Sequence, residues 1–435
     1  MSQLQIFSSH ARTALAAAAF ATLLVTSPGT TARAEVVAYT GATVETVGKA
    51  GTISNGTVVV TDGKITAVGT DVEIPAAARI VDASGQTILP ALVNIYTPIV
   101  VGSSSAPPTT RTITIGGRTF TIPSTRTTTS TAYTKLSDNV DPLTLRSYLK
   151  SQARVGVGFA NLVTRGYGQS ITARVTPDNA ADCIVNKDGH LFLAVTNSTS
   201  SLDVLRKGLK GSSGRSSSSA LAAAMAARAS GGSSSATPTT SSSSRSSSTS
   251  TSPTAALWTS VREGQTPVIL NVNNAATISY VLDIHKEYKK ARFILVASGQ
   301  NIYRTREMLK DSNISVLLKA GIDTAPRSNR RINVPRELAE AGVTFGFSPS
   351  LDSSLSSMPD TPLLPVAMLV KSGLKKEAAL KALTLTPATM LGLDAKLGSI
   401  EAGKQANLMF LDGDPLTSAS KVQELVVEGV TVYEN

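Results

Sequence analysis

The sequence predicts an α/β protein with a central (β/α)8 barrel and β-rich segments at both chain ends. The chain has 435 residues and 41% hydrophobic content, which suits one large α/β domain with an accessory piece. Apolar strand patterns alternate with helical patterns through its middle. Short β-rich runs separated by glycine-containing turns occupy both ends.

The first 34 residues have the pattern of an export signal. The apolar run "ARTALAAAAFATLLVTSP" contains Arg12 near its start, and Ala32-Arg33-Ala34 forms a small-x-small cleavage site before Glu35. The alternative is a membrane anchor, but the unbroken apolar part is shorter than the roughly 20 residues of a membrane span. We therefore expect residues 1–34 to be removed, and the protein to be periplasmic or extracellular in a bacterial envelope.

Charge and cysteine content exclude some classes of protein. Formal net charge is +11, and removal of Arg12 and Arg33 would leave (41 − 2) − 30 = +9. Basic residues are scattered and aromatics are only 4%, so we expect a solvated basic surface and no nucleic-acid partner. The one cysteine, Cys183, excludes an internal disulfide; without a neighbouring base it is predicted to be structural and buried.

Both chain ends, residues 35–90 and 397–435, are predicted to be β-structure. "GTVVVTDGKITAVG" contains two strands separated by Asp62-Gly63, a strong hairpin signal. "ELVVEGVTVYE" turns in the same way at Glu428-Gly429.

Residues 91–396 are predicted to form the barrel. Helical patterns such as "PLTLRSYLKSQA" and "ATISYVLDIHKEYKK" separate most of its strands, but none separates the second strand from the third. The eight strand candidates are Leu92–Val100, Gly156–Val163, Ser170–Val175, Leu191–Thr196, Pro267–Asn273, Arg292–Ala297, Ile314–Leu318 and Val343–Ser348.

Two stretches interrupt this pattern. Residues 103–134 contain a predicted hairpin around Gly116-Gly117, placed at the barrel mouth because it follows the first strand. Residues 211–253 are dominated by Ser, Thr, Gly and Ala and cannot bury enough apolar surface to fold alone. Apart from a helix expected at residues 220–228, we expect disorder from about Ser230, either as a tolerated insertion or as a linker or attachment site.

Several motifs resemble one enzyme family. "TVVVTDGKITAVGTDVEIPAAARIVDASGQTILPALVN" is similar to the start, and "ALKALTLTPATMLGLDAKLGSIEAGKQANLMFLDGDPL" to the close, of amidohydrolase-superfamily proteins, especially imidazolonepropionase-like and related periplasmic members. "ALWTSVREGQTPVILNVNNAATI" and "ELAEAGVTFGFSPS" match its middle. The resemblance implies a metal-dependent-hydrolase TIM barrel, with a small composite β-sandwich formed by both chain ends.

The resemblance also implies one or two divalent metals, such as zinc, held at the barrel mouth. The family pattern is His-x-His on strand one, a carboxylated Lys or Glu on strand four, histidines on strands five and six, and Asp on strand eight. The metal would activate a water for hydrolysis. At the matching positions this chain has side chains that are weak, neutral metal ligands or that have no ligand atom at all. These positions are Tyr96, Pro98, Asn197, Asn271, Asn273, Ser298 and Ser350.

A histidine count supports this conclusion without any alignment. The chain has three histidines, and His10 lies in the expected signal segment. His190 precedes strand four and His285 lies in a polar helix, so neither is expected at the mouth. Asp323 and Asp352 lie in mouth loops, where solvated acids are the simpler interpretation. We find no Ser-His-Asp arrangement.

The segment "TRGYGQS", residues 164–170, resembles a Gly-Gln mouth turn of the family. One set of charges could bind an anion, although a solvated basic loop is the simpler interpretation. It consists of Lys319, Arg327, Arg330 and Arg331, at the end of strand seven and on the loop that follows.

The sequence therefore favours an exported pseudoenzyme of the amidohydrolase family without a metal or other cofactor. Its mouth would bind a polar small molecule or a protein partner, and a homo-oligomer is compatible with this. One alternative is a hydrolase of carbon–nitrogen bonds, such as cyclic amides, with a non-standard site. Another is an envelope scaffold that uses the Ser-rich segment and the added hairpin.

Overall fold

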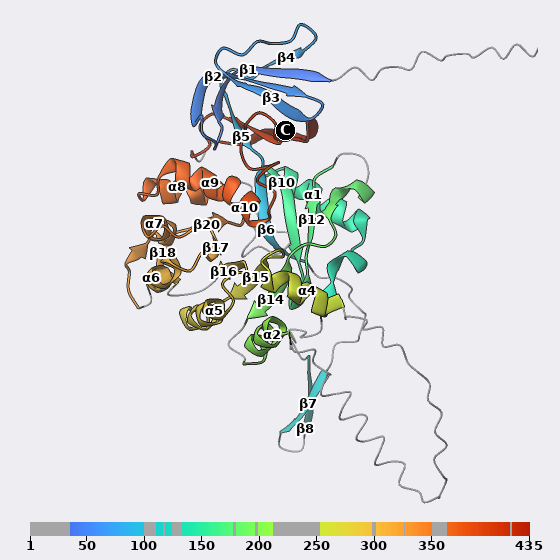
Figure 1. Cartoon of the computed structure of the whole chain (residues 1–435), viewed down its shortest axis with the longest axis vertical. Coiled ribbons are helices and arrows are strands. Elements are labelled where there is room, and N and C mark those ends of the chain that lie inside the picture. Colours follow the sequence, from blue (N-terminus) through green and yellow to red (C-terminus); the bar gives the residue numbers. More distant parts are fainter. Residues whose placement is uncertain are drawn as a thin grey trace, which may run out of the picture. The chain divides into compact units, whose positions relative to one another are not determined.

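The computed structural model describes most of the chain from residue 35 onward (Figure 1). The expected export signal, the Ser-rich stretch 212–252 and the helix expected at residues 220–228 lie outside the described residues. The described ranges are 35–99, 110–115, 118–123, 133–176, 180–195, 199–211, 253–297, 302–325, 327–349, 363–417 and 420–435.

Strands from both chain ends form one eight-stranded sheet. Its order is β23-β22-β21-β5-β1-β2-β3, with β4 also paired to β1. The antiparallel pair β5–β21 joins the two ends, with Leu89 opposite Met409. The strands are β1 (Val36–Glu45), β2 (Thr52–Thr61), β3 (Lys64–Gly69), β4 (Arg79–Asp82), β5 (Gln86–Pro90), β21 (Leu408–Asp412), β22 (Val422–Val427) and β23 (Val430–Glu434).

The two predicted hairpin turns are confirmed, and they lie against each other. Asp62 and Gly63 have φ of 49° and 74°, and Glu428 and Gly429 have φ of 51° and 83°. Positive φ at both central residues is typical of the type I′ turn, which matches the twist of its strands. A Cβ on Gly63 would overlap the Glu428 carbonyl oxygen, and one on Gly429 would overlap Gly63 itself. Glycine is therefore required at both turns.

The second sheet contains five of the predicted barrel strands. Its order is β20-β17-β16-β15-β14-β11-β9, and the first five strands are mutually parallel. They are almost entirely buried and apolar, as expected for parallel strands covered on both faces. The strands are β9 (Tyr133–Lys135), β11 (Tyr167–Gln169), β14 (Leu191–Val195), β15 (Val268–Val272), β16 (Phe293–Ala297), β17 (Ser315–Leu318) and β20 (Phe345–Phe347).

A third sheet contains the other three predicted barrel strands, and one of them runs in the direction opposite to the one predicted. It has the order β13-β12-β10-β6, in which β6 (Leu92–Pro98) and β10 (Val157–Val163) are parallel. β12 (Ile171–Arg174) runs antiparallel to β10 and also pairs with β13 (Ile184–Asn186). The segment predicted as the third parallel strand, Ser170–Val175, is therefore a returning strand, which is why no helix precedes it. Among the described residues, the eight predicted barrel strands lie in two separate sheets, and not in one continuous barrel sheet.

Helices follow the parallel strands, and their start signals lie in the sequence. Asp141 caps the first helix, accepting hydrogen bonds from the Leu143 and Thr144 amides, and Asn274 caps α5 through the Thr277 amide. Within the described ranges no helix is long and apolar enough to cross a membrane. The helices are α1 (Pro142–Ala153), α2 (Thr199–Lys210), α4 (Pro253–Arg262), α5 (Ala275–Glu287), α6 (Arg306–Lys310), α7 (Val334–Glu340), α8 (Leu364–Lys371), α9 (Lys376–Leu383) and α10 (Leu385–Met390).

Two small hairpins complete the described structure. β7 (Thr110–Ile115) and β8 (Arg118–Pro123) pair antiparallel, which confirms the hairpin predicted around Gly116-Gly117. β18 (Asp323–Thr324) and β19 (Arg331–Ile332) form a second hairpin after β17.

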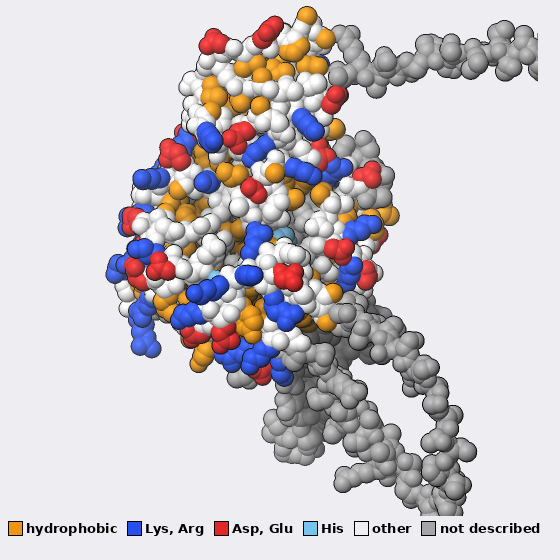
Figure 2. All heavy atoms as spheres, in the orientation of Figure 1, with side chains coloured by type: hydrophobic (Ala, Val, Ile, Leu, Met, Phe, Trp, Pro, Cys, Tyr) orange, Lys and Arg blue, Asp and Glu red, His pale blue; other side chains and the backbone are white. Residues whose placement is uncertain are grey.

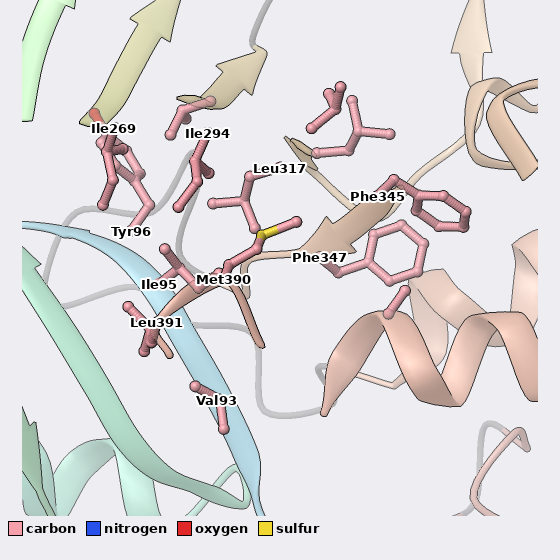
Figure 3. Close-up of a cluster of buried hydrophobic side chains, with 14 of the residues drawn as sticks. Val93, Ile95, Tyr96, Ile269, Ile294, Leu317, Phe345, Phe347, Met390 and Leu391 are labelled. Atoms are coloured by element: carbon pink, nitrogen blue, oxygen red, sulfur yellow. The ribbon is translucent and has the colours of Figure 1, made fainter. Parts of the chain in front are cut away.

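One apolar core runs through the parallel strands. Tyr96, Ile269 and Ile294 lie on one side of the view, whereas Phe345 and Phe347 of β20 lie on the other, near a helix (Figure 3). The chain-end sheet approaches this core closely, because a Cβ on Gly156 would overlap the Met409 sulfur. α9 also contacts that sheet: the Lys376 Nζ lies 2.6 Å from the buried Glu45 carboxylate.

Candidate ligand site at the carboxyl ends of the parallel strands

The carboxyl ends of the parallel strands meet at one edge, which we call the mouth. In β15, β16, β17 and β20 the final residues are in register, so these strands end at one level. Two contacts bring β6 to the same edge: Ser348, just after β20, donates from Oγ to Asn94 Oδ1 (2.6 Å) and to the Tyr96 carbonyl (3.2 Å).

A β-bulge in β6 shapes the mouth. Asn94 pairs with Ala160 and Thr97 pairs with Leu162, so two residues of β6, Ile95 and Tyr96, lie opposite one residue of β10. The opposing residue is Asn161, whose Nδ2 donates to the Ile95 carbonyl (2.9 Å). Buried amide and hydroxyl groups thus satisfy carbonyls that the bulge leaves without a ladder partner.

The bulge places the Tyr96 side chain across the strands toward β15. The Asn271 Nδ2 donates to the Tyr96 hydroxyl over 3.1 Å, although the two residues are 175 positions apart. The Tyr96 ring is 8% exposed and lies 5.9 Å from the Phe192 ring, centre to centre. Two positions where the family resemblance expects histidine ligands are therefore bonded directly to each other.

The electrostatics of Tyr96 keep its hydroxyl protonated at neutral pH. Burial raises the pKa of Tyr96, and this outweighs the lowering caused by the Asn271 hydrogen bond and the positive charge of Arg165. A protonated phenol is a poor metal ligand but a good hydrogen-bond donor.

The other predicted mouth residues divide into two groups. Pro98 ends β6 and has no side-chain donor, and Asn273 is exposed just after β15, where its Oδ1 accepts from the Asn274 Nδ2 at 3.0 Å. Asn197, Ser298 and Ser350 lie outside the described residues, as does Asp352.

Both described histidines are buried. His190 lies immediately before β14, as predicted, so it is at the opposite end of the strands from the mouth. It is fully buried, and burial together with Arg292 lowers its pKa to about 4. His285 on α5 is buried, and its Nε2 lies 2.7 Å from the Ser312 carbonyl. Cys183 is buried as predicted, and burial raises the pKa of its thiol, so it is not an activated nucleophile.

Cations follow two of the strands at the mouth. Arg165 is exposed just after β10, and Lys319 is exposed just after β17. The predicted anion-binding arginines lie on the β18–β19 hairpin: Arg327 and Arg330 in its turn and Arg331 in β19. Asp323, at the start of the hairpin, is also exposed.

Four functional or supporting residues were missed by sequence reasoning. Asn94, Asn161 and Ser348 are buried polar side chains that hold the bulged strand, and Arg165 acts electrostatically on Tyr96. Asn94 and Asn161 each interrupt an apolar strand, in "ALVNIY" and "GFANLV", and this buried-polar signal could have been used. Arg165 lies in a loop and gave no such signal.

These residues do not fit a divalent metal. Within the described ranges, no group of three His, Cys, Asp or Glu side chains lies close enough together to hold one. The described side chains at the mouth are the neutral Tyr96 phenol and the carboxamides of Asn271 and Asn273. The NH2 group of Asn271 already donates to the Tyr96 hydroxyl.

Comparisons with known proteins agree on the family. The Amidohydrolase family model matches residues 272–432. An imidazolonepropionase from Syntrophobacter fumaroxidans is 27% identical over 122 residues, which is 27% of this chain and 28% of that protein. Residues 272–432 of this chain are therefore similar to the amidohydrolase family. The match spans just over a quarter of this relative and carries no activity over to this chain.

Solved structures show the amidohydrolase-type fold over most of the chain. An amidohydrolase from Thermotoga maritima has a TM-score of 0.67 at 20% identity, covering 92% of this chain and 100% of that one. A prolidase complexed with N-methylphosphonate-L-proline has a TM-score of 0.52 at 14% identity, with the same coverage of both chains.

Proposed function

We propose that this chain is a superfamily member that has lost metal-dependent hydrolysis and keeps the mouth as a binding site for a small polar molecule. The observation that carries the proposal is the 3.1 Å hydrogen bond between Asn271 and Tyr96. In a hydrolase these two positions would supply imidazole nitrogens to the metal that activates water. Here each side chain instead satisfies the other.

The finer features of the architecture belong to the same proposal. A TIM barrel would require β6 and β20 to be neighbours, and the Ser348 bonds to Asn94 and to the Tyr96 carbonyl support that neighbourhood. A composite sandwich would require strands from both chain ends, which the β5–β21 pair supports. Export to a periplasmic or extracellular location rests on the sequence of residues 1–34 alone.

The second candidate is a hydrolase of carbon–nitrogen bonds with a non-standard site, which superfamily membership favours. An assay separates the two. The purified chain is incubated with a panel of cyclic amides and N-acyl amino acids, with added zinc or manganese and, in parallel, with a chelator. We expect no hydrolysis above the protein-free rate in any arm. Turnover that requires added metal and disappears with chelator would overturn the proposal.

A further inference from the structure

A cleft lies between the chain-end sheet and α9, away from the mouth. One wall is the connection between β1 and β2, and the other is one face of α9. Val44 near the end of β1 pairs with Ile88 of β5, and β5 leads into β6 through Ala91. The cleft is therefore near the amino end of β6, whereas the mouth is at its carboxyl end. Its volume of about 280 Å³ is below the roughly 300–1,000 Å³ of sites for drug-sized ligands and suits a molecule of amino-acid size.

A largely buried ion pair forms part of this cleft. The Glu45 side chain is 6% exposed, and one of its carboxylate oxygens lies 2.6 Å from the Lys376 Nζ. The other oxygen accepts a hydrogen bond from the Thr52 Oγ1 over 2.7 Å. Stability alone does not explain such a pair, because the cost of removing two charges from water can exceed their mutual attraction. The carboxylate and the ammonium have more hydrogen-bonding sites than these contacts use, so both can bind a further partner.

The connection between β1 and β2 is strained where it lines the cleft. Val47 has a φ of 55°, and the other described non-glycine residues with positive φ are not β-branched. Such a φ is an outlier for a β-branched residue, and backbone strain of this kind is concentrated at binding and active sites. Hydrogen bonds fix the connection: the Thr46 Oγ1 donates to the Gly51 carbonyl (2.7 Å) and accepts from the Gly48 amide (3.2 Å). Together with Leu380 of α9, Val47 gives the cleft an apolar lining in a fixed position.

The charged side chains that line the cleft are balanced in sign. α9 adds Glu377 and Lys381, both exposed, to the pair formed by Glu45 and Lys376. An ion of a single sign is attracted by two of these groups and repelled by the other two. A molecule that carries both charges can instead place each charge beside an opposite one. The lining therefore favours a zwitterion with an apolar part.

From these features we propose that the cleft binds a free amino acid with an apolar side chain. The Glu45 carboxylate accepts a hydrogen bond from the ammonium group of the ligand, and Lys381 pairs with the ligand carboxylate. Val47 and Leu380 pack against its side chain. This inference goes beyond the proposed function, because it concerns a second site that shares no residue with the mouth.

Isothermal titration of the purified chain with L-leucine tests the proposal. Isocaproate lacks the ammonium group and isoamylamine lacks the carboxylate, so these two compounds are the controls that carry a single charge. We expect saturable binding of leucine at one site per chain. Each control should bind about tenfold more weakly or worse, as expected for loss of one hydrogen bond between charged groups. Absence of leucine binding, or equal binding of either control, would overturn the proposal.

Variants locate the site. Glu45→Gln should weaken leucine binding about tenfold, and its thermal unfolding shows whether it is folded. Lys381→Gln changes an exposed side chain and should weaken binding about threefold or more, so it decides the matter if Glu45→Gln does not fold. The matched control is Lys375→Gln, which removes an exposed lysine immediately before α9 that does not line the cleft. This control and Tyr96→Phe at the mouth should leave the dissociation constant unchanged. If either weakens binding as much as Lys381→Gln, leucine does not bind in the cleft as proposed.

Discussion

The two ends of the parallel strands use polar groups differently. At the closed end, His190 is fully buried before β14, and cations alternate with acids in the turns, as in Lys187-Asp188 and Arg262-Glu263. Figure 2 likewise shows Lys and Arg side chains interspersed with Asp and Glu over much of one face. At the mouth, Asn271 donates a hydrogen bond to the Tyr96 hydroxyl, and the exposed Arg165 and Lys319 follow β10 and β17. The closed end thus buries a histidine, whereas the mouth pairs two neutral side chains with each other.

The largest expected effect comes from His190, at the closed end. Its pKa is lowered to about 4 from an ordinary 6.5, so the unfolded chain binds more protons between these values. Its contribution to stability is therefore complete above about pH 6.5 and is lost as pH falls toward 4. At 1.36 kcal/mol per pKa unit the loss is about 3 kcal/mol. Urea unfolding from pH 7 to 4 measures it.

The control for this prediction is His190→Gln, which removes the titrating group. This variant should lose most of the pH dependence in that range, whereas exposed titrating groups affect both proteins equally. If the free energy of unfolding depends on pH to the same extent in the two proteins, His190 does not produce the effect.

Asn161→Ala tests whether the bulge depends on its buried amide. The Ile95 carbonyl and the Ser170 hydroxyl would each lose a partner (2.9 Å in both cases). Leaving buried polar groups unpaired should lower the free energy of unfolding by about 2 kcal/mol. The exposed Asn273→Ala is the matched variant, with an expected change below about 0.5 kcal/mol. If both variants lose a similarly small free energy of unfolding, the Asn161 amide does not stabilise the bulge.

At the mouth, Tyr96→Phe should cost less stability than either change above. It removes one partly solvated hydrogen bond to Asn271 and keeps the buried ring, so a loss of about 1 kcal/mol or less is expected. A stability loss comparable to that of Asn161→Ala would place Tyr96 with the supporting residues.

The smallest expected effect comes from the mouth cations. Arg165→Gln removes one charge from a basic surface, so the free energy of unfolding should be unchanged or slightly increased, within about 0.5 kcal/mol. Chemical denaturation at low and high salt checks this, since any gain should shrink as salt screens the repulsion. A clear destabilisation would mean that Arg165 has a structural partner.

Local patterns in the sequence predicted most elements, because their causes are local. Asp62-Gly63 and Glu428-Gly429 specify their turns through backbone conformation, and Asp141 specifies the start of α1 through its cap. The alternating pattern of β12 is the same in a parallel or antiparallel pair, so only the missing helix before it indicated its direction. The prediction of a third parallel strand was wrong for that reason.

The candidate site was only partly predictable. The family resemblance singled out Tyr96 and Asn271, but their mutual hydrogen bond depends on a bulge that two strands create together. Asn161 and Ser348 matter only because they satisfy carbonyls near that bulge. No periodicity in a single segment encodes such a partnership between distant residues.

The measurement that tests the central claim most directly is metal content. The chain, purified without a histidine tag, is incubated with zinc and manganese, desalted, and analysed by inductively coupled plasma mass spectrometry. Because Tyr96 and Asn271 bond to each other and offer neutral donors, we predict well below about 0.1 equivalent of metal per chain. Retention of about one or two equivalents would contradict the account and return this chain to the metal-dependent hydrolases.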